Sequence, residues 1–344
     1  MPKTIKKCFY EKLTFEKFLL AHKRARKSKG MKSEVIDFER NLENNLINLI
    51  NQIANGTYTS GRYRSFIIYE PKERIIEALP YRDRVVHQWY IEEFIKPYIL
   101  PRFINSSFAC LDDKGTHIAV DTLQKYMRVM KRNEGYFWIL KCDIKKYFYN
   151  INNDILFNII QRYIYDKNLL NFSKKVIYTK SNSRIGIPIG NYTSQYFANI
   201  YLNELDQFVK RELKIKYYVR YMDDFVILLR NKEECKRVKN VISVFLMSFL
   251  KLELNAKSKY YPYKMGIDFC GYRTYTTHRL LRTSNKKKIK KKIKKWNRLW
   301  EKNKCDIYAV RASVNAWLGH VSHCNSYRLR EKLFSEAKFI YNNI

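Results

Sequence analysis

The chain has 344 residues, 46% of them hydrophobic and 15% aromatic, with only 10 glycines and 7 prolines. This composition can fill one large core or about two ordinary domains, which excludes a wholly disordered chain and a collagen-like repeat. Lysine and arginine number 67 against 32 acidic residues, so the formal net charge is +35. Because a polyanion would neutralise that self-repulsion, nucleic acid is the first candidate partner and an anionic membrane surface the second.

The apolar residues and the cysteines favour a cytoplasmic protein that does not associate with a membrane. No stretch approaches the roughly 18 uncharged apolar residues of a membrane-spanning helix. Charged residues follow the basic start at 1–7, so no signal peptide is predicted. The seven cysteines are widely spaced and form no CxxC pair. This usage is typical of reduced thiols in a reducing compartment.

Apolar periodicity and turn residues predict helices and strands that interleave without strict alternation. The expected fold class is therefore α+β, with helices on one face of a sheet. In chain order, the predicted elements are two helices within 14–54 around a basic loop at 23–30, strands at 65–69 and 75–79, helices at 82–98 and at 116–131 with Thr116 as its cap, a strand at 136–144, helices at 153–165 and 191–213, strands at 216–221 and 225–229, a helix at 233–250, strands near Tyr260 and Phe269, and a basic helical tail from Ser284.

Two acidic positions stand at the ends of predicted strands. Asp223 and Asp224 lie between two apolar strands, which places adjacent, mutually repelling carboxylates at a hairpin tip. Hard oxygen ligands suit Mg²⁺, although Asp-Asp alone is more often a simple turn. Asp143 ends the strand at 136–144, where an aspartate is otherwise a turn or cap residue. Two aspartates from separate strand ends can hold two metal ions about 3.5–4 Å apart.

Five segments in order resemble the motifs of reverse transcriptases across residues 60–275. The upstream segments resemble the fingers of group II intron enzymes and related bacterial enzymes. The matching residues are Lys72, Arg74 and 81–87 in the fingers, Asp143 with Phe148 as motif A, Tyr221-Met222-Asp223-Asp224 as motif C, Leu252-Glu253-Leu254-Asn255 with Lys257 and Lys259 as motif D, and Phe269-Cys270-Gly271-Tyr272 as the primer-grip motif E.

The resemblance implies a right-hand polymerase that carries out RNA-directed DNA synthesis with two Mg²⁺ ions and dNTP substrates. It implies an N-terminal extension and fingers at 1–135, a palm of antiparallel sheet backed by helices at 136–275, and a helical thumb at 276–344. A catalytically inactive RNA-binding relative is the alternative from another class. The tail after motif E has no carboxylate set for RNase H.

The resemblance also assigns roles to individual residues. Asp143 and Asp223 would ligate both metal ions, with Ile144 beside them and Asp224 shaping the site. Phe148 would exclude a ribose 2′-OH, while Lys72 and Arg74 would hold the triphosphate unless they are only solvated charges on a hairpin. The remaining predicted nucleotide-binding residues are Ile189, Gly190, Gln195 and Lys257, with Lys259 as the other candidate for the motif D lysine.

Residues 189–195 read Ile-Gly-Asn-Tyr-Thr-Ser-Gln, where most bacterial relatives have QGxxxSP. The IGxxxSQ pattern is similar to that of diversity-generating retroelements, whose enzymes copy a template-repeat RNA and misincorporate opposite adenine. Ile189 would offer the incoming nucleotide no hydrogen bond and would weaken discrimination, unless it is only a core residue. This subfamily implies a template RNA, an RNA/cDNA duplex and a pentameric accessory variability protein as partners. Retron and group II intron types remain alternatives.

The tail from 286 to 295 is almost entirely lysine, interrupted by isoleucines at helical spacing. An apolar stripe of Ile289, Ile293, Trp296 and Trp300 is expected to dock while the lysines track a nucleic-acid backbone. A calmodulin-target or membrane-surface helix has the same pattern, and a zinc site of Cys305, His320, His323 and Cys324 fits no standard spacing. The predicted nucleic-acid-binding residues are Arg82, Arg84, Lys287, Lys291 and Lys294.

Overall fold

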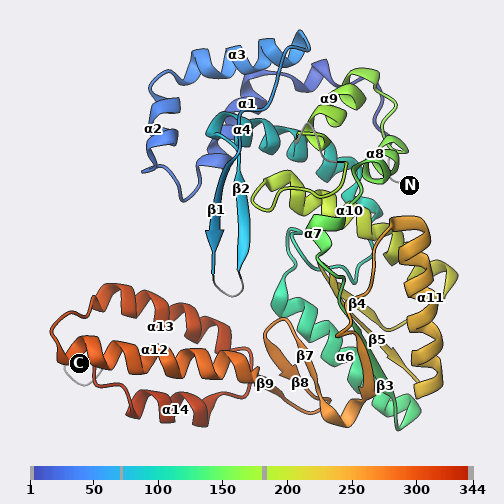
Figure 1. Ribbon diagram of the computed structural model, residues 1–344, viewed down its shortest axis with the longest axis vertical. Coiled ribbons are helices and arrows are strands. Elements are labelled where there is room, and N and C mark those ends of the chain that lie inside the picture. Colours follow the sequence, from blue (N-terminus) through green and yellow to red (C-terminus); the bar gives the residue numbers. More distant parts are fainter. Residues whose placement is uncertain (1–3, 70–72, 180–183, 340–344) are drawn as a thin grey trace. The chain divides into compact units, whose positions relative to one another are not determined.

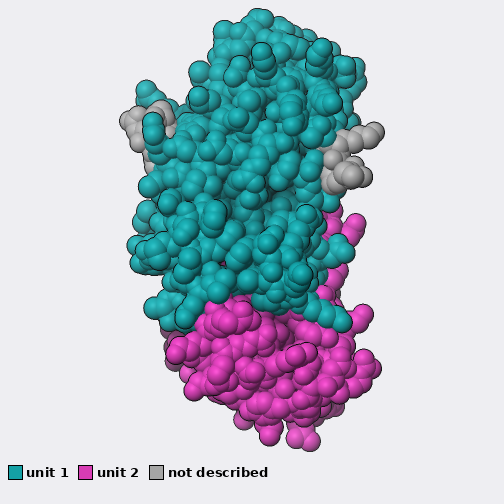
Figure 2. All heavy atoms as spheres, turned by 90° about the vertical axis from the view of Figure 1, so that its right-hand side faces the viewer, with its two compact units in different colours: residues 1–110, 142–216, 239–258 teal, residues 111–141, 217–238, 259–344 magenta. Residues whose placement is uncertain are grey.

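The computed structural model describes residues 4–69, 73–179 and 184–339. The chain forms two compact units, and each unit is assembled from separate segments (Figure 2). The first unit contains residues 1–110, 142–216 and 239–258, and the second contains 111–141, 217–238 and 259–344.

The N-terminal part of the first unit is a set of helices packed around Trp89. This fully buried ring contacts Phe18 at 4.9 Å, Phe94 at 5.2 Å and Phe172 at 5.4 Å between centroids. The first four residues of the predicted basic loop at 23–30 are helical instead, because Ala25 continues the buried face of the first helix. The helices here are α1 (Phe15–Arg26), α2 (Ser33–Glu39), α3 (Leu42–Ala54) and α4 (Tyr81–Tyr90), after a short 3₁₀ turn, η1 (Tyr10–Lys12).

A hairpin of two strands extends away from these helices (Figure 1). Strand β1 (Arg64–Ile68) pairs antiparallel with β2 (Arg74–Ala78), which confirms both predicted strands to within one residue. Most of its side chains are exposed. Lys72 lies outside the described residues, and Arg74 is the first residue of β2.

The rest of the first unit is also helical. The predicted helix at 82–98 is α4 continued by a π-helical segment, and the helix at 191–213 likewise ends in π-helix. Helix α9 was not predicted. It begins where the Asp166 carboxylate accepts hydrogen bonds from the backbone N–H groups of Asn168 and Leu169. The elements are η2 (Ile91–Ile95), α5 (Lys96–Tyr98), η3 (Leu100–Arg102), α7 (Tyr147–Asn150), α8 (Asn153–Gln161), α9 (Lys167–Ile177), α10 (Tyr192–Gln207) and η4 (Phe208–Glu212).

The second unit is built on a four-stranded sheet with the order β4-β5-β3-β6. Its strands are β3 (Trp138–Cys142), β4 (Tyr218–Tyr221), β5 (Asp224–Leu229) and β6 (Lys259–Pro262). Helix α6 (Thr116–Glu134) packs against β4 and β5. Thr116 is the first residue of this helix and not its cap, because Gly115 holds the cap position with a backbone that only glycine adopts readily. Helix α11 (Lys232–Leu250) follows β5 in the chain.

A three-stranded antiparallel sheet and three helices complete the second unit. The strands are β7 (Ile267–Phe269), β8 (Tyr272–Thr274) and β9 (Arg279–Leu281), after a 3₁₀ turn, η5 (Tyr263–Met265). The helices are α12 (Thr283–Glu301), α13 (Ile307–Val321) and α14 (Tyr327–Ser335). Ile289 and Ile293 are buried against α13 and α14, with Trp296 and Trp300 packed beside them, which confirms the predicted stripe. The α+β class is likewise confirmed.

Across the described residues, we find no helix with the length and apolar character needed to span a bilayer.

Candidate active site

The paired aspartates lie in a tight turn between β4 and β5. Tyr221 pairs with Asp224, so Met222 and Asp223 form a two-residue hairpin loop. Met222 has φ of 57°, whereas Asp223 is not among the residues with positive φ. A positive φ at the first loop position alone is typical of a type II′ turn, where glycine is preferred. The predicted hairpin tip is confirmed, and a strained methionine holds its first position.

Lys141 fixes the second carboxylate of the pair. Its Nζ atom lies 2.9 Å from Oδ2 of Asp224 and 2.5 Å from the backbone oxygen of Asp268. Lys141 is the penultimate residue of β3, and Asp224 is the first residue of β5. The end of β3 therefore lies beside the start of the acidic turn. Lys141 was not among the residues predicted from the sequence, although it lies only two positions before Asp143.

The backbone and the side chain of Asp143 are held by the segment after α11. The backbone oxygen of Asp143 accepts from the N–H of Asn255 at 2.7 Å, and Ile144 forms a bridge with Leu254. The Asn255 side-chain amide donates to Oδ2 of Asp143 at 3.0 Å, and the Ser258 hydroxyl accepts from the Asp143 N–H at 3.2 Å. Asn255 belongs to the predicted motif D, so two of the matched motifs meet here.

The donor chemistry at these positions suits a hard divalent cation. Asp143, Asp223 and Asp224 offer only carboxylate oxygens, the ligands that Mg²⁺ prefers, and all three are partly exposed. Asn255 orients one oxygen of Asp143, and Lys141 orients one oxygen of Asp224. Over the described ranges, no three His, Cys, Asp or Glu side chains form a metal-binding group. Asp143 belongs to the first unit and the acid pair to the second.

The predicted nucleotide residues of the first unit meet along the segment 184–190. The backbone oxygen of Ile189 accepts from the N–H of Glu77 on β2 at 2.8 Å, while the N–H of Ile187 donates to the Phe148 oxygen at 2.9 Å. Gly190 has φ of 134°, and a Cβ there would lie 2.8 Å from the Glu77 oxygen. Only glycine fits this close approach of two backbones. The structure thus brings Phe148, Ile189 and Gly190 together with the strand that carries Arg74.

Other predicted residues have different surroundings. Gln195 is exposed on the first turn of α10. Lys257 is also exposed, whereas Lys259 begins β6 opposite Lys141, so the choice between these two lysines stays a prediction. Lys287, Lys291 and Lys294 are exposed on α12, and their contact with a nucleic-acid backbone stays a prediction.

Arg82 and Arg84 make contacts inside the first unit that the sequence analysis missed. Arg84 forms a two-pronged ion pair with Glu34, with N–O distances of 2.7 and 3.1 Å. Arg82 donates to the side-chain oxygen of Gln52 at 2.6 Å. Both guanidinium groups join α4 to earlier helices. Their contact with nucleic acid stays a prediction.

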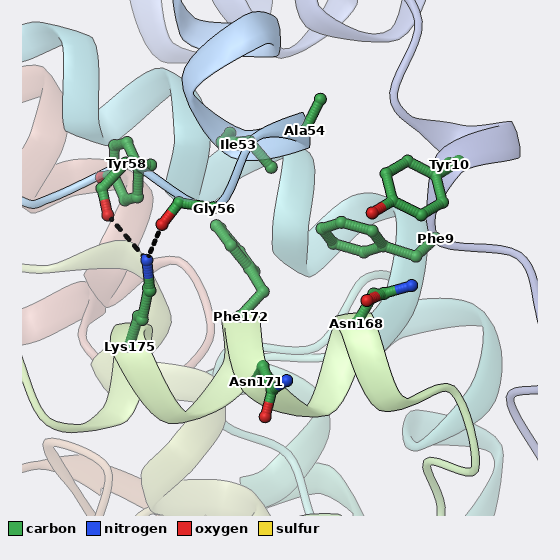
Figure 3. A pocket seen from close by; sticks show the side chains of 10 residues that line it. All are labelled: Phe9, Tyr10, Ile53, Ala54, Gly56, Tyr58, Asn168, Asn171, Phe172 and Lys175. Carbon is green, nitrogen blue, oxygen red and sulfur yellow. Dashed lines mark hydrogen bonds between the residues drawn. The ribbon is translucent and has the colours of Figure 1, made fainter.

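A separate hollow of about 120 Å³ opens in the first unit between the N-terminal segment, the end of α3 and α9 (Figure 3). Phe9 and Phe172 line it, and Lys175 donates to the backbone oxygens of Gly56 and Tyr58 at its edge. The lysine thereby bonds two carbonyl groups of the segment that follows α3. None of the predicted catalytic residues lines this hollow.

Comparison with known proteins supports the resemblance to reverse transcriptases. A family model described as "Reverse transcriptase (RNA-dependent DNA polymerase)" matches residues 70–274, which is more than half of the chain. The group II intron-encoded protein LtrA of Lactococcus lactis subsp. cremoris is 23% identical over 62% of this chain and 46% of its own. A Saccharomyces cerevisiae protein named for intron 2 of COX1/OXI3 is 22% identical over 62% of this chain and 31% of its own.

This chain spans less than half the length of either curated relative. Among solved structures, apo telomerase from Candida tropicalis aligns at 14% identity with a TM-score of 0.47, over 69% of this chain and 53% of that one. The family match covers the acidic turn at 222–224, the strand before Asp143 and the β7–β8 hairpin. The chain therefore belongs to the reverse transcriptase (RNA-dependent DNA polymerase) family.

Proposed function

We propose that this chain is an RNA-directed DNA polymerase that uses Asp143, Asp223 and Asp224 to hold two Mg²⁺ ions. The supporting observation is the 2.9 Å contact between Lys141 and Asp224. Asp143 follows Lys141 by two residues, and two residues can span at most about 7 Å. Asp143 therefore follows, along the chain, directly after the strand whose Lys141 contacts the acid pair.

The side chains around this site supply orientation and charge. Asn255 and Ser258 fix Asp143, and Lys141 fixes Asp224, so these carboxylates are oriented before substrate arrives. When bound, Mg²⁺ supplies the charge that activates a primer 3′-OH and stabilises the leaving pyrophosphate. Arg74, and Lys72 beside it in the chain, would hold the triphosphate, and Phe148 would exclude a 2′-OH.

Primer extension on an RNA template tests the activity. The double variant Asp223→Asn/Asp224→Asn should reduce cDNA synthesis about a thousandfold or more while RNA binding is kept, because only the carboxylate charges are lost. The chain offers a matched control in Asp112→Asn/Asp113→Asn, a second adjacent pair that is exposed. Equal cDNA from both double variants would show that the chain is an RNA-binding relative without catalysis.

We further propose that the enzyme is of the diversity-generating type and makes cDNA with errors concentrated opposite template adenine. Ile189 supports this, because its side chain cannot donate or accept a hydrogen bond. Its backbone is tied to β2, which also carries Arg74. A template-repeat RNA and a pentameric accessory protein would be its partners.

The substitution Ile189→Gln tests the type. An amide at this position should restore a contact to the incoming nucleotide, so the error rate opposite adenine should fall about tenfold while errors elsewhere change little. Sequencing of cDNA made on a defined RNA gives both rates. Ile185→Gln, an exposed position in the same segment, is the matched control. An unchanged spectrum in the 189 variant would remove Ile189 from the explanation.

A group II intron type is the second candidate, favoured by the match to a group II intron-encoded protein. It predicts that wild-type cDNA carries a low and even error rate at all four template bases. The same sequencing experiment therefore separates the two types.

A further inference from the structure

The acidic turn needs an external restraint because its backbone is strained. Met222 is the first residue of the two-residue loop and has φ of 57°. A side chain in this left-handed region costs about 1–2 kcal/mol relative to ordinary backbone. The two common hairpin turns, types I′ and II′, differ mainly in the rotation of the central peptide, here Met222–Asp223. That rotation also decides where the Asp223 side chain points.

Arg220 bonds the central peptide of this turn directly. Its Nη1 donates to the backbone oxygen of Met222 at 2.9 Å. The Arg220 residue is 0% exposed, so the guanidinium acts where water cannot compete. Burying an arginine costs several kcal/mol unless hydrogen bonds and nearby negative charge compensate. The Met222 carbonyl provides one such hydrogen bond.

Lys141 restrains the same turn from β3. It contacts the Asp224 carboxylate at 2.9 Å and the Asp268 carbonyl at 2.5 Å, and its Nζ lies 5.6 Å from the centre of the Phe269 ring. One lysine thus links β3, β5 and β7. Rotation of the Asp224 side chain would break this contact, so Lys141 holds the second carboxylate while Arg220 holds the central peptide.

We propose that Arg220 and Lys141 are positioning residues that lock the strained turn in one conformation and so aim the Asp223 and Asp224 carboxylates. Arg220 sets the central peptide and Lys141 sets Asp224. The consequence for metal binding rests on the proposed function, whereas the locking of the turn does not. Neither residue is proposed to touch substrate.

The conformation of the turn can be measured without activity. In protein labelled at the methionine methyl groups, the Met222 resonance should be a single sharp line for the wild type, assigned by Met222→Leu. Arg220→Gln and Lys141→Gln should split or broaden it as the central peptide samples two rotations. Arg279→Gln is the matched control, because Arg279 is also a buried arginine of the second unit and contacts Asp121, away from the turn. Thermal unfolding confirms that each variant is folded.

Binding of Mn²⁺, measured by electron paramagnetic resonance without nucleic acid, reports whether the Asp223 and Asp224 carboxylates are oriented to hold a metal ion. Arg220→Gln should weaken this binding about tenfold, and Arg279→Gln should leave it unchanged. Met222→Gly in the Arg220→Gln background should restore most of the Mn²⁺ binding. Glycine adopts a positive φ without strain, so the turn no longer needs the restraint that Arg220 supplies. A purely structural role for Arg220 gives no such rescue.

Three outcomes overturn the proposal: a Met222 line that is unchanged in Arg220→Gln, Mn²⁺ affinity that is unchanged in that variant, or no rescue by Met222→Gly. The variant Asp223→Asn separates this failure from failure of the proposed function. If Asp223→Asn leaves Mn²⁺ binding intact, the proposed metal role of the turn is wrong. The Met222 methyl resonance alone then decides whether Arg220 and Lys141 lock the turn.

Discussion

His87 shows how a single buried residue couples the stability of this protein to pH. The ring is 1% exposed on α4, and its Nδ1 lies 3.2 Å from the Thr193 hydroxyl on α10. Burial without a charged partner in the described contacts lowers the pKa of His87 to about 4. The side chain is therefore neutral in the folded protein at any pH near neutrality.

Protonation of His87 should contribute to acid destabilisation. Between pH 6.5 and about 4, the unfolded chain binds a proton at His87 that the folded protein does not, so the free energy of unfolding falls as the pH falls. Replacing His87 with Gln should remove up to about 3 kcal/mol of this pH-dependent loss. Urea unfolding at several pH values measures it, with the exposed His278→Gln as control. Identical pH slopes for wild type and His87→Gln would contradict the assignment.

Single residues of the candidate site differ in how far sequence could identify them. Asp143 and Gly190 stood out by type and spacing, and the structure gives Gly190 a physical reason in the close approach of Glu77. Asn255 lay within a matched motif, but its hydrogen bond to Asp143 joins positions 112 residues apart. Arg220 had no sequence signal, since arginine is ordinarily an exposed residue.

At the scale of elements, length and periodicity decided which predictions succeeded. The long amphipathic helices α6, α11 and α12 and the apolar strands β3 and β5 were predicted, because each has a periodic pattern over several residues. Strands β8 and β9 have three residues each, too few to show alternation, and were missed, whereas the equally short β7 lies at the strand predicted near Phe269. Strand β8 pairs with β7, and β9 pairs with β8, so their place in a sheet comes from the fold.

Turn and cap chemistry explains the remaining differences between elements. Phe269 pairs with Tyr272, so Cys270 and Gly271 form another two-residue hairpin loop, with φ of 46° and 89°. This is the geometry of a type I′ turn, and it makes the segment predicted as motif E a hairpin. Helix α9 depends on its Asp166 cap, which also accepts from the backbone N–H groups of Cys8 and Phe9. The Asp166 side chain therefore also connects α9 to the N-terminal segment, which lies about 157 residues earlier in the chain.

For the whole molecule, the charge of +35 predicts strongly salt-dependent binding to nucleic acid. All but one of the lysines of α12 are exposed while its isoleucines are buried, so this helix presents a row of positive charge. The boundaries at 135/136 and 275/276 stay predictions. The compact units of the structure are each assembled from three separate segments.

Removing charge from α12 should weaken binding to an RNA/DNA duplex in a salt-dependent way. The triple variant Lys287→Gln/Lys291→Gln/Lys294→Gln should lower the magnitude of the slope of log affinity against log salt by about 2–3, since each phosphate contact contributes close to one. Fluorescence anisotropy at several salt concentrations measures the slope. The control replaces three other exposed lysines, Lys232, Lys236 and Lys251. Equal slopes for both triple variants would argue against a specific role for α12.

The sequence alone was enough to identify the family, the α+β class, the hairpin turn at Asp223 and the buried face of α12, because these properties depend on residue type and on local spacing. Only the tertiary structure decided which distant groups restrain the acids. The Lys141–Asp224 pair and the Asn255–Asp143 hydrogen bond join residues 83 and 112 positions apart. Such pairings follow from how strands order themselves in a sheet, which depends on packing over the whole chain and leaves no periodic pattern in the sequence.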